Sequence, residues 1–139
     1  MVEAARERIE AVVADAAALP FEDGSFDLVV AFMSLQDLDD LDGAVYEAAR
    51  VLAPPGRLAF CNLHPIATAG EFDSRDPESA YGISASYLEP KRVDELVERD
   101  AFRVTFSFVH RPLEAYARAL EQAGLLIEAI REPRPADAP

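Results

Sequence analysis

The sequence predicts an α/β fold in which strands and helices alternate around a parallel sheet. Two apolar runs of strand length, residues 26–33 and 57–63, flank a segment with helical periodicity. Such a strand–helix–strand order is typical of a right-handed crossover unit between parallel strands. The chain has 139 residues, of which 50% are hydrophobic. This suits a single domain with one modest core and excludes intrinsic disorder.

The first elements expected are a helix, a strand and a long turn. Residues 2–10 are rich in Ala, Glu and Arg, which favour a helix. Residues 9–14 form a β-branched run that ends at Asp15 and predicts a strand. Pro and Gly in residues 19–25 indicate a loop with a turn. The run over 26–33 lacks alternation, which is typical of a parallel strand covered on both faces.

The crossover helix is expected over residues 42–52. Its apolar residues recur at helical spacing along one stripe, and its acidic start suits the helix dipole. The stripe consists of Val45, Ala48, Ala49 and Leu52. Pro54, Pro55 and Gly56 predict a turn before the strand over 57–63.

The middle of the chain is expected to be irregular. Residues 64–85 have no hydrophobic period and predict a long loop or lid, and residues 87–99 are ambiguous. Residues 102–109 alternate large apolar with polar side chains, which predicts a half-buried strand.

The last elements expected are a helix and a strand. Residues 112–123 predict a helix that ends at Gly124. Residues 125–130 predict a strand, and the Pro-rich tail over 132–139 predicts a frayed end. The apolar stripe of the helix consists of Leu113, Tyr116, Ala117 and Leu120.

Charge and cysteine content exclude several classes of function. The chain has 26 acidic and 13 basic residues, giving a net charge of −13. Nucleic acid and anionic membranes are therefore not expected as partners. The single cysteine, Cys61, excludes an intrachain disulfide and a multi-thiolate zinc site, and no metal is expected. A lone thiol and the lack of a signal peptide or spanning run predict a cytoplasmic protein.

The order of these elements carries a resemblance to a known family. The text ADAAALPFEDGSFDLVVAFMSLQDLDDLDGAVYEAARVLAPPGRLAF resembles class I S-adenosylmethionine-dependent methyltransferases. The later text HRPLEAYARALEQAGLLIEAIREP is similar to the ubiquinone-biosynthesis-like branch, which acts on small molecules. The resemblance implies a Rossmann-like fold, S-adenosylmethionine as cofactor and a small-molecule methyl acceptor. It also implies that residues 1–139 are a single partial domain in which residues 64–111 cover the substrate.

The resemblance places the cofactor against residues after two of the strands. Asp15 would accept a hydrogen bond from the adenine amine, and the Ala16 amide would contact the ring. The alternative is that Asp15 only caps the following turn. Three residues would line the methionine end of the cofactor, although the first two are also explained by core packing. These residues are Phe32, Met33 and Leu35.

Two further side chains are candidate substrate contacts. Gln36 lies just beyond the apolar run over 26–33, and His64 follows the strand over 57–63 at the carboxyl edge of the sheet, where open α/β sheets bind ligands. A histidine there is a candidate general base, whereas the alternative is a hydrogen bond within the loop. No residue is assigned to direct chemical attack, because alignment of the reactants can suffice for methyl transfer.

The chain departs from the family at its beginning. The glycine-rich loop G-x-G-x-G is absent, and the resemblance implies that the first strand, first helix and second strand are missing. The exposed edge of the strand over 26–33 would then pair with the strand over 9–14 or with a second copy of the chain. Two functions stay open: methyl transfer to a small molecule, or a non-catalytic remnant that acts as a binding or dimerisation module.

Overall fold

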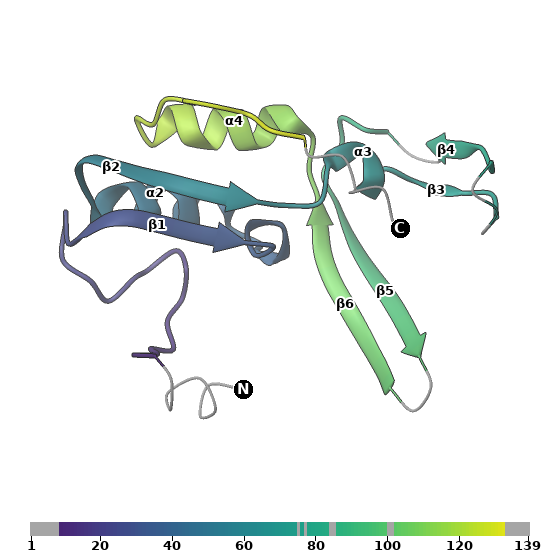
Figure 1. Ribbon diagram of the computed structural model, residues 1–139, viewed down its shortest axis with the longest axis horizontal. Coiled ribbons are helices and arrows are strands. Elements are labelled where there is room, and N and C mark those ends of the chain that lie inside the picture. The colour runs from purple at the N-terminus through teal and green to yellow at the C-terminus, as the bar shows by residue number, and fades with distance from the viewer. Residues whose placement is uncertain (1–8, 75, 77, 84–85, 100–101, 133–139) are drawn as a thin grey trace, which may run out of the picture.

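The fold is built on a pair of parallel strands joined by one helix (Figure 1). The computed structural model describes residues 9–74, 76, 78–83, 86–99 and 102–132. In the pair, Val29 lies opposite Leu58 and Ala31 opposite Phe60. The elements in chain order are β1 (Phe26–Phe32), the 3-10 turn η1 (Leu35–Asp37), α2 (Leu41–Val51), β2 (Leu52–Cys61), α3 (Pro65–Thr68), β3 (Gly70–Phe72), β4 (Tyr81–Ile83), β5 (Lys91–Arg99), β6 (Phe102–His110) and α4 (Leu113–Gln122). The predicted α/β fold and crossover unit are confirmed.

Helix α2 begins and ends close to where the sequence places it. The Asp40 side chain caps it by accepting a hydrogen bond of 2.8 Å from the Gly43 amide. The turn expected at 54–56 is instead part of β2, where the pairing slips between Leu52 and Arg57 to form a bulge. Proline lacks an amide hydrogen, so these residues interrupt the ladder without ending the strand.

Helices α2 and α4 pack together and bury one face of the parallel pair. Their core contains Leu35, Leu41, Val45, Tyr116, Ala119 and Leu120, and Ala31 and Leu58 of the strands pack against it. The Phe60 ring also stacks on Tyr116, with centroids 6.2 Å apart. The buried face of α4 includes Ala115 and Ala119, so the predicted position Leu113, which is exposed, was wrong, and Ala117 is half-buried. The buried stripe of α4 runs along Ala115, Tyr116, Ala119 and Leu120, and Leu113 lies outside it and is exposed.

The other face of the parallel pair is apolar and exposed among the described residues. Leu28, Val30 and Phe32 on β1 are 55%, 64% and 74% exposed. The expectation that both faces of this strand are covered was therefore wrong for the described part of the chain. One face of the strand packs against the helices, and the apolar side chains of its other face are exposed in the part of the chain that the structure describes.

Two predicted strands do not form. Residues 9–14 and 125–130 are irregular, and Leu126 is 95% exposed. Among the described residues β1 pairs only with β2, so the expected pairing with residues 9–14 is also absent. A strand needs a neighbour for its amides and carbonyls, and sequence pattern alone does not supply one. The helix predicted over 2–10 and the tail over 132–139 lie mostly outside the described residues.

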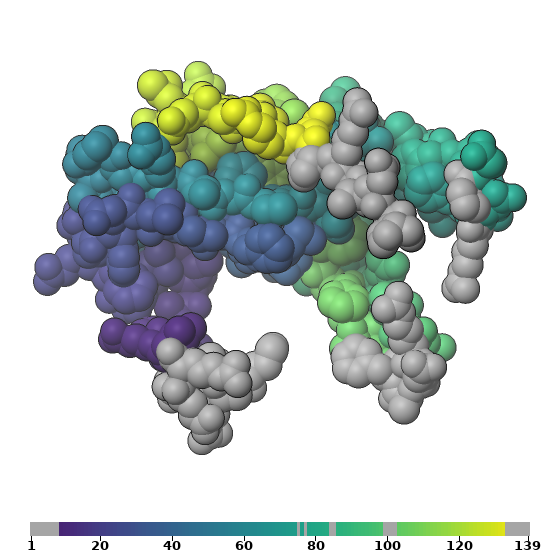
Figure 2. Space-filling view, in the orientation of Figure 1, coloured from purple at the N-terminus to yellow at the C-terminus, as the bar shows by residue number. Residues whose placement is uncertain are grey.

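The segment after β2 is more regular than expected. Residues 64–85 contain α3 and the antiparallel pair β3–β4, so the long irregular loop was wrong. Strands β5 and β6 form a second antiparallel pair, so residues 91–99 are a strand and the strand predicted over 102–109 is confirmed, although Phe106 on its predicted buried face is 54% exposed. This hairpin projects from the body of the molecule (Figure 2). Among the described residues, no helix is both long and apolar enough to cross a membrane.

A charged network ties the loop before β1 to helix α2. Arg50 donates to the carboxylates of Glu47 and Asp23 at 2.7 and 2.6 Å, and to the carbonyls of Leu19 and Phe21. Glu47 also accepts a 2.8 Å hydrogen bond from the Leu19 amide. The hydrogen bonds from Arg50 and Leu19 lower the pKa of Glu47 to about 2. The network therefore favours the folded state while Glu47 is ionised.

The core packing predicts that two leucines contribute very differently to the free energy of unfolding. Leu120 is 9% exposed in the core, whereas Leu126 is 95% exposed. We expect Leu120→Ala to lower the free energy of unfolding by about 2–5 kcal/mol through loss of buried surface and creation of a cavity. Leu126→Ala should change it by less than about 0.5 kcal/mol. Urea unfolding followed by circular dichroism measures both, and equal effects would contradict this core.

The Arg50 network predicts a dependence of stability on pH. The folded pKa of Glu47, about 2, lies below the ordinary value of 4.5. The unfolded chain therefore binds the proton first, and stability is lost as pH falls from 4.5 toward 2. We expect Glu47→Gln to be less stable than the natural chain at pH 7 and to lose less stability on acidification. Urea unfolding at pH 7 and pH 3 tests this, with exposed Glu121→Gln as control; parallel losses in all three proteins would refute it.

Candidate functional site

The candidate site lies at the carboxyl edge of the parallel pair, where the ends of β1 and β2 are joined. The Met33 amide donates to the Cys61 carbonyl at 2.7 Å. Gln36 is buried, and its Oε1 accepts a 2.8 Å hydrogen bond from the Leu63 amide. Met33 has a φ of 51°, a left-handed conformation that turns the chain sharply after β1. Two hydrogen bonds thus join the segment after β1 to the end of β2 and the segment that follows it, and together these segments form one edge of the sheet.

The junction between β6 and α4 brings a buried cation to this edge. Arg111 is 7% exposed, and its Nη2 donates to the carbonyls of Leu38 and Asp39 at 2.5 and 3.0 Å. The Tyr116 hydroxyl lies near Arg111 and Asn62, and burial raises the pKa of Tyr116. Residues far apart in the sequence therefore meet beside the ends of β1 and β2.

Polar atoms in this cluster are buried without a protein partner. Both amide atoms of Asn62 and the Nη1 of Arg111 are inaccessible and make no hydrogen bond within the described structure. Sequence analysis did not single out Asn62 or Tyr116 for the site, and it weighed His110 with Arg111 only as a weaker candidate than His64. For Asn62 the available signal was its position, a polar residue directly after a predicted strand. The meeting of Asn62 with Arg111 depends on how α4 packs, which the sequence does not show.

The three residues predicted to line the methionine end of the cofactor differ in burial and do not share one surface. Leu35 is buried in the core, and Phe32 is largely exposed on the open face of the sheet. Met33 lies between them and is half-buried. Core packing, the alternative considered for Phe32 and Met33, does not hold for Phe32, whereas Leu35, for which it was not considered, is a core residue. Contact of Phe32 and Met33 with a cofactor stays a prediction.

Asp15 stabilises a turn and keeps an exposed carboxylate. Its Oδ1 accepts a 2.9 Å hydrogen bond from the Ala17 amide, and its carbonyl accepts one of 3.0 Å from the Ala18 amide. This is the capping role considered as the alternative. The other carboxylate oxygen has no partner among the described residues. Asp15 can therefore cap the turn and still accept a hydrogen bond from a ligand, and Ala16 lies beside it.

His64 is engaged on both ring nitrogens. Nδ1 accepts a 3.1 Å hydrogen bond from the Ile66 amide and caps α3, and Nε2 lies 2.9 Å from a carboxylate oxygen of Glu132. A nitrogen that accepts from an amide carries no proton, so the proton resides on Nε2. The basic nitrogen is therefore occupied, and the geometry favours the loop hydrogen-bonding alternative over general-base catalysis.

The second histidine, His110, connects three segments. It is 3% exposed, its Nδ1 lies 2.7 Å from the Thr68 hydroxyl, and its Nε2 lies 3.0 Å from the Tyr87 carbonyl. The Tyr87 hydroxyl in turn accepts a 3.0 Å hydrogen bond from the Leu113 amide at the start of α4. His110 therefore attaches the segment between β2 and β5 to the body and sets the position of the adjacent Arg111.

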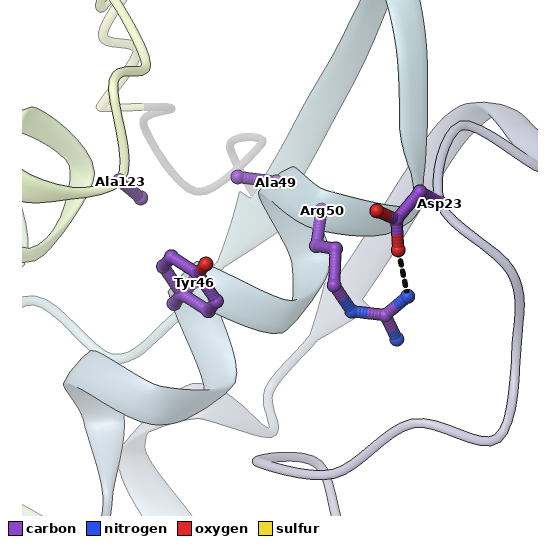
Figure 3. A pocket seen from close by; sticks show the side chains of 5 residues that line it. All are labelled: Asp23, Tyr46, Ala49, Arg50 and Ala123. Carbon is purple, nitrogen blue, oxygen red and sulfur yellow. Dashed lines mark hydrogen bonds and ion pairs between the residues drawn. The ribbon is translucent and has the colours of Figure 1, made fainter.

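A hollow of about 230 Å³ lies at the opposite end of the fold (Figure 3). It is lined by Asp23, Tyr46, Ala49, Arg50 and Ala123. Arg50 already binds Asp23 there, as Figure 3 shows. Because open α/β sheets bind ligands at the carboxyl ends of their strands, this hollow is not the candidate site. No group of side chains in the described residues is arranged to hold a metal ion.

Comparisons with known proteins identify relatives of the chain. A family model of the methyltransferase domain matches residues 1–60. A ubiquinone/menaquinone biosynthesis C-methyltransferase of Hahella chejuensis is 34% identical over 125 residues, which cover 87% of this chain and 47% of that relative. A malonyl-[acyl-carrier protein] O-methyltransferase of Methylococcus capsulatus is 53% identical over 49 residues, or 35% of this chain and 18% of that relative. The chain thus spans about half the length, or less, of these curated relatives.

Solved structures share the fold. A Listeria monocytogenes protein assigned as an S-adenosylmethionine-dependent methyltransferase superposes with a TM-score of 0.76 at 18% identity, covering 98% of this chain and 66% of that one. An S-adenosylmethionine-dependent methyltransferase from Mesorhizobium loti gives a TM-score of 0.67 at 26% identity, covering 89% and 56%. The expected Rossmann-like fold and the resemblance to class I methyltransferases of the ubiquinone-biosynthesis type are confirmed.

The bond between Gln36 and Leu63 predicts the effect of a substitution at the edge. Gln36→Met keeps the side-chain length but removes the acceptor for the Leu63 amide. We expect a loss of about 1–3 kcal/mol in the free energy of unfolding, because the amide is left without its partner. Exposed Gln122→Met at the end of α4 is the control and should be nearly neutral. Chemical unfolding measures both, and a neutral Gln36→Met would show that the edge is not held by this bond.

Proposed function

We propose that this chain, which carries the fold of class I methyltransferases, serves methyl transfer from S-adenosylmethionine to a small-molecule acceptor. The single observation that supports this most directly is the meeting of the segments after β1 and β2 at one carboxyl edge. Open α/β sheets bind their ligands at that edge. The match of residues 1–60 to the methyltransferase domain family covers the same strand β1 and the turn at Asp15.

The residues proposed to hold the cofactor suit its chemistry in part. S-adenosylmethionine supplies an activated methyl group on a sulfonium cation. The free carboxylate oxygen of Asp15 suits the adenine amine, and the Ala16 amide suits a ring nitrogen. The accessible Phe32 and Met33 offer apolar and aromatic surface, which favours a cation without reacting with it. Leu35 is buried, so its proposed contribution is to support the turn that carries Met33.

The proposed mechanism relies on alignment of the reactants. The chain would hold the acceptor nucleophile in line with the methyl carbon and sulfur, which lowers the entropic part of the barrier. Residues 64–111 would cover the acceptor, and Gln36 and His64 would stand close to it as positioning groups. No residue is assigned a proton-transfer step, because the basic nitrogen of His64 already accepts from Ile66. The lone thiol of Cys61 favours a cytoplasmic setting for this chemistry.

The alternative proposal is a non-catalytic module that binds a partner or a second copy of itself. It is supported by the exposed apolar face of β1 at Leu28, Val30 and Phe32 and by the edge of β1 that is unpaired among the described residues. Such an edge can pair with the same strand of another molecule. The two functions differ in whether the chain binds the cofactor.

Calorimetric titration of S-adenosylhomocysteine into the full chain tests the first proposal. We expect micromolar binding, equivalent to about −8 kcal/mol. Asp15→Ala should weaken it by about 1–3 kcal/mol, because a buried adenine amine loses its acceptor. Asp94→Ala, an exposed aspartate on the projecting hairpin, is the control and should bind as the natural chain does.

Light scattering on the same samples measures the oligomeric state and so distinguishes the binding module from the enzyme. A folded dimer that gives no binding heat at millimolar ligand would overturn the enzymatic proposal and support the binding module. A monomer that binds the ligand would overturn the dimerisation module.

A further inference from the structure

The projecting hairpin of β5 and β6 has two outer edges that pair with no other strand among the described residues. Its ladder joins nine successive residue pairs without a shift in register, and neither strand contains proline. Each outer edge therefore presents an uninterrupted row of backbone amides and carbonyls. A two-stranded hairpin is only marginally stable by itself in water, and an open edge is a place at which another strand can pair.

Charged side chains protect the edge of β5 but not the edge of β6. Strand β5 contains three basic and three acidic residues, whereas Arg103 is the one Lys, Arg, Asp or Glu residue of β6. Proteins prevent unwanted pairing at an edge by placing charges, proline or a bulge there. The β6 edge lacks the last two devices and carries a single charge, so it is the edge that is open to a partner strand.

The accessible part of the β6 edge is its distal half, residues 103–107. Nearer the body of the molecule, β6 contacts η1, and Phe108 and His110 are buried. Figure 1 shows the distal half of the hairpin standing away from the β1–β2 pair and its helices. The exposed residues of this half are Arg103, Thr105, Phe106 and Ser107, and Val104 is half-buried. A partner strand therefore has five residues with which it can pair.

The charge of the hairpin suits contact with a second copy of this chain. Residues 91–110 contain four basic and four acidic residues, so the net charge of −13 lies in the rest of the chain. The polar side chains beside the open edge are also paired within the hairpin. Arg103 binds Glu98 at 2.9 Å, and the Ser107 hydroxyl donates to Asp94 at 2.5 Å. Two copies that meet through their hairpins thus add no net repulsion at the contact.

The side chains of residues 103–107 are self-complementary in an antiparallel pair. When the Thr105 residues of two copies lie opposite each other, each Val104 faces the Phe106 of the other copy, and each Arg103 faces the Ser107. Pairs of threonines, and pairs of an aromatic with a β-branched side chain, are favourable across strands. Phe106 is 54% exposed in the single chain and gains an apolar neighbour. No facing pair in this register brings like charges together.

We propose that two copies of this chain pair through the β6 edges of their hairpins, about a two-fold axis at Thr105. The product is a four-stranded antiparallel sheet in the order β5–β6–β6–β5. A two-fold contact of this kind closes on itself and leaves only the charged β5 edges outside. Five facing residue pairs make a small interface, so the dimer is weak and depends on protein concentration.

This contact is independent of the two functions proposed above. It does not use β1, so it differs from the dimerisation module, which pairs through the β1 edge. It is also compatible with cofactor binding at the carboxyl edge of the β1–β2 pair. A dimer that binds S-adenosylhomocysteine is therefore the combined outcome that we expect.

Sedimentation equilibrium over a range of protein concentrations measures the dissociation constant of the dimer. We expect the natural chain to dimerise reversibly. Ser107→Lys leaves Asp94 with a partner inside the hairpin but places a cation opposite the Arg103 of the other copy. It should raise the dissociation constant by about fivefold or more, because like charges that face each other across strands are unfavourable. Ser86→Lys makes the same change in net charge at an exposed serine before β5 and should dimerise as the natural chain does.

Cross-linking tests the register and does not depend on the strength of the dimer. Thr105→Cys in a Cys61→Ser background should give a disulfide-linked dimer on mild oxidation. Residues that face each other in antiparallel strands have Cα atoms about 4.5–5.5 Å apart, which a disulfide can span. Leu96→Cys in the same background is the matched control. Leu96 is exposed and lies opposite Thr105 within the hairpin, but it belongs to the β5 edge and should not cross-link.

Several outcomes would overturn the proposal. The natural chain could stay monomeric at every concentration, or Leu96→Cys could cross-link as well as Thr105→Cys. A dimer that persists in Ser107→Lys but is lost in Val30→Lys, on the open face of β1, would place the contact at β1 instead. Circular dichroism shows whether each variant folds, and if Ser107→Lys does not fold, the cross-linking result decides.

Discussion

The packing of α2 and α4 against one face of the β1–β2 pair is the constraint on which the rest of the structure depends. Val45 and Ala119 are each 1% exposed at the centre of that contact. A two-stranded parallel pair has too little buried surface to be stable alone, so its position is fixed by the helices that cover it. The stacking of Phe60 on Tyr116 extends the same contact to the strands. The same core fixes the position of the carboxyl edge, because the strands that end at this edge pack against it.

That core also explains how distant residues reach one edge. Tyr116 belongs to the buried face of α4, and Arg111 lies just before this helix begins. Once α4 is packed on α2, Arg111 has no path to solvent and must lie against the loop after η1. Its hydrogen bonds to Leu38 and Asp39 are a consequence of that packing. The segment from β3 to β6 is then attached through His110, so the covering segment and the buried cation are positioned together.

Charge is distributed unevenly over this fold. At the amino end of the strands, Arg50 is surrounded by carboxylates and carbonyls and serves to attach the loop before β1. At the carboxyl edge, Arg111 is more deeply buried and has no carboxylate partner among the described residues. The first arrangement pairs a cation with carboxylates, whereas the second places a cation among main-chain carbonyls and the Tyr116 side chain. The exposed face of β1 is a further departure from a fully stabilised sheet. Functional sites commonly depart from optimal stability in these ways.

The sequence by itself predicted the local elements and the fold. Helical spacing in residues 42–52 and 112–123 and the apolar runs before and after α2 predicted these elements because each depends on its own residues. The order of elements also predicted the methyltransferase fold. The strands expected at 9–14 and 125–130 do not form, because a strand needs hydrogen-bond partners from a neighbouring strand, and its own residues do not provide them. Tertiary structure alone decided that Leu35 is in the core and that Asn62 and Arg111 lie together. Those outcomes depend on the docking of α4, a contact between residues distant in sequence that no local pattern records.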